Sequence, residues 1–219
     1  MEHGVIGRRA VLLAGAGITA RRATAALPVP PADALRFRLI RHDSEIGRHI
    51  VTFETRDDTL TVRVAVDSRV TLLSVPIVHY RHRVVETWQG ETLTSLTSET
   101  DKNGRLGWMN AQRTAEGLVV LGSQTDRYIA PDSAIGTTYW NKRMLDGPMI
   151  SLEDGVLLHP TVTRDPADLI RLASGNSVVA DHYRLSGSFN VDVWYDHADT
   201  WASLALTVAD GSRIHYERL

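Results

Sequence analysis

The densest run of side chains that can exchange protons or contact a ligand is residues 79–88, HYRHRVVETW. On a β-strand, alternate side chains point to opposite faces of the sheet. A face of aromatic rings with a few polar tips is typical of the wall of a small-molecule pocket. The alternative is an outer face on which the rings pack against cross-strand neighbours. The side chains expected to share one face are Tyr80, His82, Val84, Glu86 and Trp88.

His82 is the residue of this face best suited to proton transfer, because imidazole exchanges protons near neutral pH. In a cofactor-free isomerase, hydrolase or lyase it would act as general acid or base, assisted by Glu86 or Arg81. The usual catalytic motifs, such as a nucleophile elbow, a phosphate-binding glycine loop or a zinc-protease helix, are missing from the sequence. Catalysis is therefore the second hypothesis, and binding is the first.

A metal site in this strand is not expected. His79 and His82 are three residues apart, so they point to opposite faces and cannot bind one ion together. His82 and Glu86 share a face but lie about 13 Å apart along a strand.

A second cluster, residues 137–143 (TTYWNKR), places an indole and an amide next to each other as Trp140 and Asn141. These side chains would line the mouth of a cavity, or Trp140 would instead anchor a short helix to the sheet. In a third cluster, Asp196 and His197 resemble a dyad but enter a turn, where Asp is common for backbone reasons. The predicted ligand-binding residues are Tyr80, His82, Trp88, Trp140 and Asn141.

The N-terminal segment predicts export. Arg8-Arg9 forms a basic region, residues 10–20 form a short apolar stretch of 11 residues, and residues 23–26 (ATAA) supply a cleavage site. That stretch is shorter than the roughly 20 residues that span a bilayer. Paired arginines before a Gly/Ala-rich stretch favour the twin-arginine route. We therefore expect residues 1–26 to be a removable signal peptide and the protein to be periplasmic or secreted, with the export machinery as one partner.

The composition narrows the functions of the mature chain. Cleavage would remove four of 24 basic and one of 26 acidic residues, which leaves a net charge of −5. An acidic chain with scattered charges does not favour nucleic acid or anionic lipid. The sequence contains no cysteine, which excludes disulfides, thiolate metal sites and a cysteine nucleophile. We expect no cofactor and no membrane-spanning segment in the mature chain.

Residues 27–219 read as a single domain of short strands separated by turn residues. Asn103-Gly104 predicts a tight hairpin, because both residues readily adopt positive φ. Residues 124–136 read as a loop. The predicted strands are 35–42, 48–56, 59–66, 70–89, 92–100, 105–114, 118–123, 178–185, 189–195, 201–208 and 213–218.

Two short helices are expected between these strands. One is residues 138–146, followed by Gly147. The other is residues 165–174, with Asp165 as N-cap, Pro166 in the first turn and Gly175 after the end. The pattern predicts a large curved antiparallel sheet, a half-barrel, whose concave face is covered by these helices.

Several segments resemble a family of uncharacterised exported bacterial proteins, a domain of unknown function distantly similar to the LolA and LolB periplasmic carriers. The segments are FRLIRHDSEIGRHIVTF (37–53), Tyr80-Arg81, ETW (86–88), TSETDKNG (97–104), TYWN (138–141), VWYD (193–196) and GSRIHYE (211–217). The resemblance implies a half-barrel and no known reaction. Carriers of the LolA type hold acyl chains, whereas residues 79–88 are polar, which argues against a purely lipidic ligand. The expected partner is an apolar or amphipathic small molecule held in the cavity of the curved sheet.

Overall fold

A computed structural model of the chain describes residue 1 and residues 27–72, 75–208 and 210–219. The predicted signal segment lies outside these residues. The chain forms sixteen strands and one short 3-10 helix in the described ranges. The elements are β1 (Ala34–Arg41), β2 (Ser44–Arg56), β3 (Thr59–Leu72), β4 (Val75–Gln89), β5 (Thr92–Lys102), β6 (Arg105–Thr114), β7 (Gly117–Gly122), β8 (Thr125–Ala130), β9 (Ile135–Gly136), η1 (Lys142–Asp146), β10 (Met149–Ile150), β11 (Leu157–Leu158), β12 (Thr161–Arg171), β13 (Ser177–Ser186), β14 (Val191–Asp196), β15 (Trp201–Thr207) and β16 (Arg213–Arg218).

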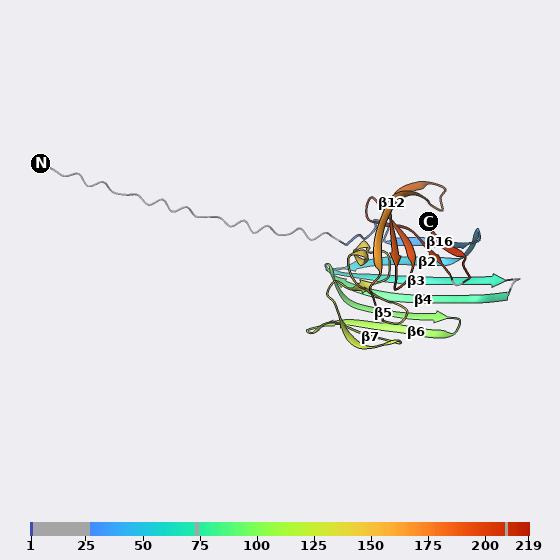
Figure 1. The fold of residues 1–219 in the computed structure, drawn as a ribbon. Helices are drawn as coiled ribbons and strands as arrows, with labels where there is room; N and C mark the ends of the chain where they lie inside the picture. The colour runs from blue at the N-terminus through green and yellow to red at the C-terminus, as the bar shows by residue number, and fades with distance from the viewer. Residues whose placement is uncertain (2–26, 73–74, 209) are drawn as a thin grey trace.

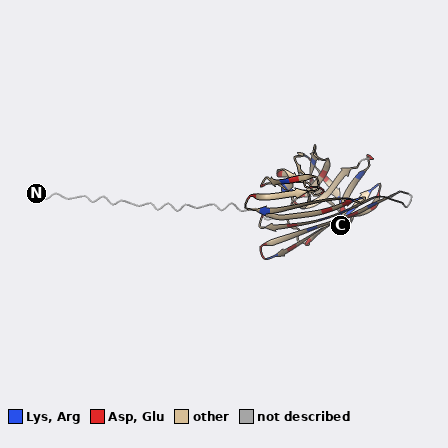
Figure 2. Cartoon of the chain, turned by 90° about the horizontal axis from the view of Figure 1, so that it is seen from below, with Lys and Arg blue, Asp and Glu red and all other residues tan. Residues whose placement is uncertain are grey.

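Thirteen of these strands form one antiparallel sheet in the order β12-β13-β14-β15-β16-β1-β2-β3-β4-β5-β6-β7-β8. The sheet does not close, because β12 and β8 are its two edges. The predicted mainly β fold with a large curved antiparallel sheet is confirmed. The charged side chains are interspersed along the strands instead of gathering in one region (Figure 2).

One face of the sheet, here called the inner face, carries the core. Alternation along β2 and β3 places Val51, Phe53, Val62 and Val64 on this face, each less than a tenth exposed. The β2–β3 register sets Val51 opposite Val64 and continues this face across the two strands. Burial of these β-branched and aromatic side chains is the main favourable term that holds the sheet together.

Residues 131–160, here called the inserted segment, cover the inner face. This segment contains η1 and a small sheet of order β11-β10-β9. In Figure 1 it is the yellow part of the chain, between the green strands and the orange and red strands. Its side chains Trp140, Met144, Met149 and Ile150 are almost fully buried. The curved sheet is therefore filled by its own chain.

The predicted helix at residues 165–174 is wrong, since residues 161–171 form the edge strand β12. Pro166 lies at an irregularity of the β12–β13 register between Asp165 and Asp168, where a strand tolerates a residue without an N–H. Gly175, with φ of +89°, turns the chain between β12 and β13. The same Asp-Pro and Gly signals that start and stop a helix also mark a bulge and a hairpin turn.

Two other local predictions are corrected, and one is confirmed. The loop predicted at 124–136 contains β8 and β9, and the helix predicted at 138–146 is reduced to the five-residue η1. The hairpin at Asn103-Gly104 is confirmed, with φ of +55° and +81° between β5 and β6. No helix within the described residues is long and apolar enough to cross a membrane.

We expect Gly122→Ala to lower the free energy of unfolding by more than about 2 kcal/mol, since an added Cβ would overlap backbone atoms of Asp154 and Gly155 in the inserted segment. Gly147→Ala is the matched control, because its Cβ would meet only Ser133 at 3.1 Å or more. Urea unfolding followed by tryptophan fluorescence measures both. Equal stability of the two variants would contradict the tight packing of the inserted segment on β7.

Candidate functional site

Glu86 lies at the centre of the contact between the sheet and the inserted segment. The indole N–H groups of Trp88 and Trp140 both donate to Glu86 Oε2, at 2.9 and 2.8 Å. The hydroxyl of Thr138 donates to Oε1 at 2.8 Å. Two of the three donors belong to the inserted segment, so this carboxyl group fastens that segment to β4.

The environment of Glu86 is apolar except for these donors. Its side chain is fully buried, and the ring centroids of Trp88 and Trp140 are 5.8 Å apart in an edge-on arrangement. Burial raises the pKa of Glu86, and the hydrogen bonds from the two indoles and Thr138 partly oppose that rise. The group is thus a buried acid held by hydrogen bonds.

The Glu86 contacts determine where Tyr139 lies. Thr138 and Trp140 both bind Glu86, and Tyr139 between them has φ of +63°, a left-handed conformation that bulky residues rarely adopt. Its carbonyl oxygen accepts a hydrogen bond of 2.8 Å from the Tyr195 hydroxyl. The Tyr139 ring lies 5.5 Å from the Trp201 ring. Backbone strain of this kind costs roughly 1–3 kcal/mol and is concentrated at functional sites.

Tyr139 belongs to a group of titratable rings on the inner face that we call the His–Tyr cluster. Strand register places its two histidines on the same face, two strands and about 10 Å apart: His49 on β2 is opposite Val66 on β3, and Val66 is opposite His82 on β4. The electrostatic influence of His82 on His49 agrees with this register. The His–Tyr cluster consists of His49, Tyr80, His82, Tyr139 and Tyr216.

His49 is the least satisfied member of the cluster. Its side chain is 5 % exposed, and neither ring nitrogen has a hydrogen-bond partner among the described residues. The rings of Trp201, Tyr216 and Phe37 surround it, at centroid distances of 5.0, 5.7 and 6.2 Å. Burial, and secondarily the proximity of His82, lowers the pKa of His49 to about 3. The imidazole is therefore neutral at neutral pH.

His82 is buried on the same face as His49, two strands away, and has one side-chain partner among the described residues. Its Nδ1 lies 2.8 Å from the Thr100 hydroxyl, across the β4–β5 pair. Burial, and secondarily the positive charge of Arg83, lowers the pKa of His82 to about 4. Both histidines of the cluster are thus uncharged above about pH 5.

The three tyrosines form the partly exposed side of the cluster. The Tyr80 hydroxyl donates to Glu153 Oε1 at 3.2 Å. Burial, and secondarily the charge of Glu153, raises the pKa of Tyr80 and of Tyr139. Burial, with Tyr139 second, also raises the pKa of Tyr216. The cluster is a set of neutral donors and acceptors enclosed by aromatic rings.

The structure divides the predicted ligand-binding residues into two groups. Tyr80 and His82 belong to the His–Tyr cluster, whereas Trp88 and Trp140 are buried against Glu86. Asn141 is also buried, and its Oδ1 accepts a hydrogen bond of 3.1 Å from the Arg143 N–H at the start of η1.

The residues predicted to assist His82 lie elsewhere. Arg81 is on the face of the sheet opposite the inner face, here called the outer face, with Nε 3.7 Å from Asp67 Oδ2. Glu86 is four residues along the strand from His82, about 13 Å away, and its oxygens are already hydrogen-bonded.

Sequence reasoning missed His49, Tyr139 and Tyr216. A signal for His49 was present, because the predicted strand 48–56 alternates His49, Val51 and Phe53 on one face. This alternation predicts that His49 is buried together with Val51 and Phe53. Tyr216 has no comparable local signal, because β16 reaches the cluster only through its pairing with β1.

A second histidine network lies on β12–β14, on the face of the sheet opposite the inner face. His182 Nε2 is 2.9 Å from Asp192 Oδ1, its Nδ1 is 3.3 Å from Asp168 Oδ2, and its ring stacks on Trp194 at 4.4 Å. Asp192 also pairs with Arg213 at 2.9 Å. Within the described part of the chain, no three or more His, Cys, Asp or Glu side chains are placed so that together they could hold a metal ion. This network fastens neighbouring strands together.

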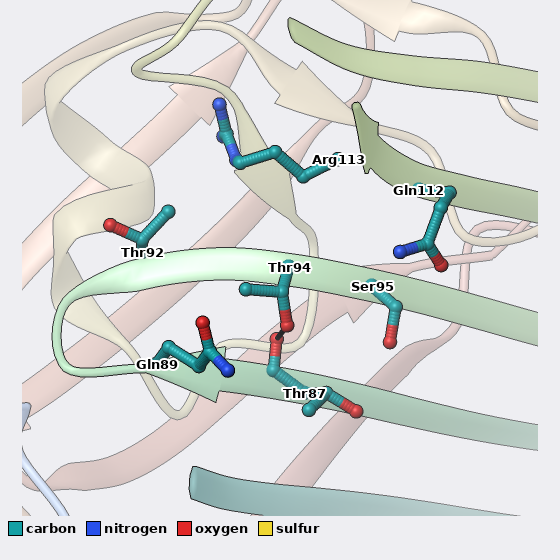
Figure 3. A pocket seen from close by; sticks show the side chains of 7 residues that line it. All are labelled: Thr87, Gln89, Thr92, Thr94, Ser95, Gln112 and Arg113. Atoms are coloured by element: carbon teal, nitrogen blue, oxygen red, sulfur yellow. Dashed lines mark hydrogen bonds between the residues drawn. The ribbon is translucent and has the colours of Figure 1, made fainter. Parts of the chain in front are cut away.

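A polar pocket of about 620 Å³ opens on the outer face near the β4–β5 turn (Figure 3). Its only charged lining residue, Arg113, donates from Nε to the Leu93 carbonyl at 2.9 Å and from Nη1 to Asp132 at 3.2 Å. No aromatic ring lines it. The lining residues are Thr87, Gln89, Thr92, Thr94, Ser95, Gln112 and Arg113.

The open antiparallel sheet and the ring-lined inner face define a β-barrel-like protein filled by its own inserted segment. The family described as "Domain of unknown function (DUF6134)" matches residues 37–219, and the chain belongs to this family. The predicted membership in a family of unknown function is confirmed.

One solved structure similar to this chain is the beta-barrel-like protein of domain of unknown function DUF1849 from Brucella abortus. It has a TM-score of 0.59 and 9 % sequence identity, over 85 % of this chain and 94 % of that chain. At this identity the likeness shows the fold alone. No curated protein matches the chain.

Replacing Glu86 tests its role as a fastening group. In Glu86→Gln the amide oxygen can accept from both indoles while the amide N–H donates to Thr138, whose hydroxyl can also accept. We expect unfolding free energies within about 1 kcal/mol of the wild type for Glu86→Gln and more than about 3 kcal/mol lower for Glu86→Ala, which leaves buried donors unpaired.

Glu99→Gln on the exposed outer face is the control. Because the pKa of Glu86 is raised, its ionisation costs stability as the pH rises through that pKa. The stability of Glu86→Gln relative to the wild type should therefore increase as the pH rises above 4.5, the ordinary pKa of the carboxyl group, in urea unfolding. Equal losses for Glu86→Gln and Glu86→Ala would show that the negative charge itself is needed.

The lowered pKa values of His49 and His82 predict stability that is complete above about pH 6.5 and lost as the pH falls toward 4. Between pH 6.5 and 5 each histidine contributes a loss of about 2 kcal/mol. Comparing urea unfolding of the wild type and His49→Phe over this range isolates the contribution of His49 to the pH dependence, since both proteins contain Glu86 and His82. Parallel pH profiles for the two proteins would contradict a neutral, buried His49.

Proposed function

We propose that this protein binds a small amphipathic molecule at the His–Tyr cluster. The observation that carries the proposal is His49, a buried imidazole inside a group of aromatic rings that has no hydrogen-bond partner in the described part of the chain. Buried polar groups in proteins are nearly always hydrogen-bonded, and exceptions point to a bound molecule. Apolar walls with a few convergent polar groups are the usual form of a small-molecule site.

The proposed cellular role is that of a periplasmic binding or carrier protein. It is supported by the paired arginines and the short apolar stretch at the N-terminus. Twin-arginine export moves folded proteins, so the domain would fold, and bind its ligand, before export. A likeness to the LolA and LolB carriers belongs to the same proposal.

Binding is favoured over catalysis by the placement of the charged residues. His82 has neither Arg81 nor Glu86 beside it, and its described side-chain partner is the neutral Thr100. A general acid or base needs a proton acceptor or donor within hydrogen-bond reach of the reacting group. The cofactor-free enzyme is thus the weaker proposal.

The proposal is tested with N-phenyl-1-naphthylamine, a neutral probe whose fluorescence rises in apolar sites. We expect saturable binding to the wild type and at least tenfold weaker binding to Tyr139→Gly. This substitution removes one ring of the cluster while it relieves the positive φ of residue 139.

Asp57→Gly is the matched control, because it places glycine at a positive-φ residue of the exposed β2–β3 turn. It should bind the probe like the wild type. Absence of saturable binding by the wild type, together with no small molecule released from protein purified without detergent in native mass spectrometry, would overturn the proposal.

A further inference from the structure

We infer that the ligand of the His–Tyr cluster is an uncharged planar molecule with a hydroxyl group, of the phenol class, whose hydroxyl hydrogen-bonds to His49. The inference rests on the proposed binding function and specifies its ligand. Three features of the described residues support it: the unpaired imidazole, the rings around it and the charges nearest to it.

The imidazole sets the polar requirement. A neutral histidine offers one N–H donor and one nitrogen acceptor, and in His49 both are buried with no partner in the ranges that the structure describes. A hydroxyl both donates and accepts, so it can bond to either nitrogen whichever tautomer is present. An ether or a quaternary ammonium group can supply no donor to the imidazole acceptor.

The surrounding rings set the shape. Trp201 lies near His49, Tyr139 and Tyr216, with centroid distances of 5.0, 5.5 and 5.8 Å. The ring of Phe37 belongs to the same group, with its centroid 4.1 Å from that of Trp201 and 6.2 Å from that of His49. Aromatic rings favour offset or edge-on contacts with a further ring at such distances. A planar aromatic ligand can therefore make these ring contacts, whereas a branched aliphatic molecule would make them poorly.

The nearby carboxylate and the aromatic walls disfavour ions. Glu153 accepts a hydrogen bond from Tyr80 in the cluster, whereas exposed Arg83 lies on the opposite face of the sheet, where its guanidinium donates to the carbonyl oxygens of Val66 and His82. An anionic ligand would meet the Glu153 carboxylate, and an ion of either sign would have to leave water for a site with aromatic walls. A neutral ligand avoids both costs.

The inference is tested with four molecules of one size that compete with the naphthylamine probe at pH 7: p-cresol, toluene, 4-methylbenzoate and 4-methylbenzylammonium. We expect p-cresol to bind the wild type at least tenfold more tightly than each of the other three. The hydroxyl accounts for the difference from toluene, and charge accounts for the other two.

Two substitutions identify the group that recognises the hydroxyl. His49→Phe keeps an aromatic ring without polar atoms and should reduce the preference for p-cresol over toluene to less than threefold. His49→Asn keeps a donor and an acceptor and should restore part of that preference. An unfolding temperature of His49→Phe at or above that of the wild type, expected because unpaired polar atoms are removed, shows that the variant is folded.

The outcomes separate this inference from the proposed function. Equal binding of p-cresol and toluene, tighter binding of either ion, or an unchanged preference in His49→Phe overturns the phenol class while probe binding upholds a ligand site. Failure of all four competitors to displace a bound probe also overturns the inference alone. Failure of the probe itself to bind overturns both.

Discussion

The hydrogen bonds to Glu86 are the interaction on which the inner part of the molecule depends. A sheet of thirteen strands with two free edges needs material against its inner face, and the inserted segment supplies it. Two of the three donors to this carboxyl group come from that segment, Thr138 and Trp140. Burial of an acid without a cation costs stability. The hydrogen bonds to Glu86 are therefore better explained by the position in which they hold the inserted segment than by a net gain in folding free energy.

The position it fixes is that of Tyr139. With its neighbours on both sides bound to Glu86, this residue is held in a left-handed conformation beside Trp201. The same cross-strand register that builds the core also places His49 and His82 on one face, on either side of Val66. The molecule thus holds two unfavourable features, a strained tyrosine and an unpaired buried histidine, in one place. Proteins retain such features where they serve binding or chemistry.

Strand alternation made much of the fold and part of the site predictable. It places Tyr80, His82, Glu86 and Trp88 on one face correctly. Alternation does not predict which of these side chains the inserted segment covers. Glu86 and Trp88 proved to be part of the packed core for this reason. The sequence of the edge strand β12 predicts a helix, because Asp165-Pro166 and Gly175 carry the same local signals in both structures. Tyr216 was unpredictable, because its place depends on pairing between distant strands.

The pairing of β1 with β16 has a consequence for synthesis. Arg38 and Glu217, which form an ion pair across these strands, are 179 residues apart in the sequence, and the two strands lie in the interior of the sheet. On the ribosome β1 has no partner on that side until residue 218 has emerged. A chain interrupted earlier presents two unpaired edges, on β1 and β15, which are surfaces that chaperones and proteases recognise and that promote aggregation. Closure of this gap in the sheet thus depends on the synthesis of β16.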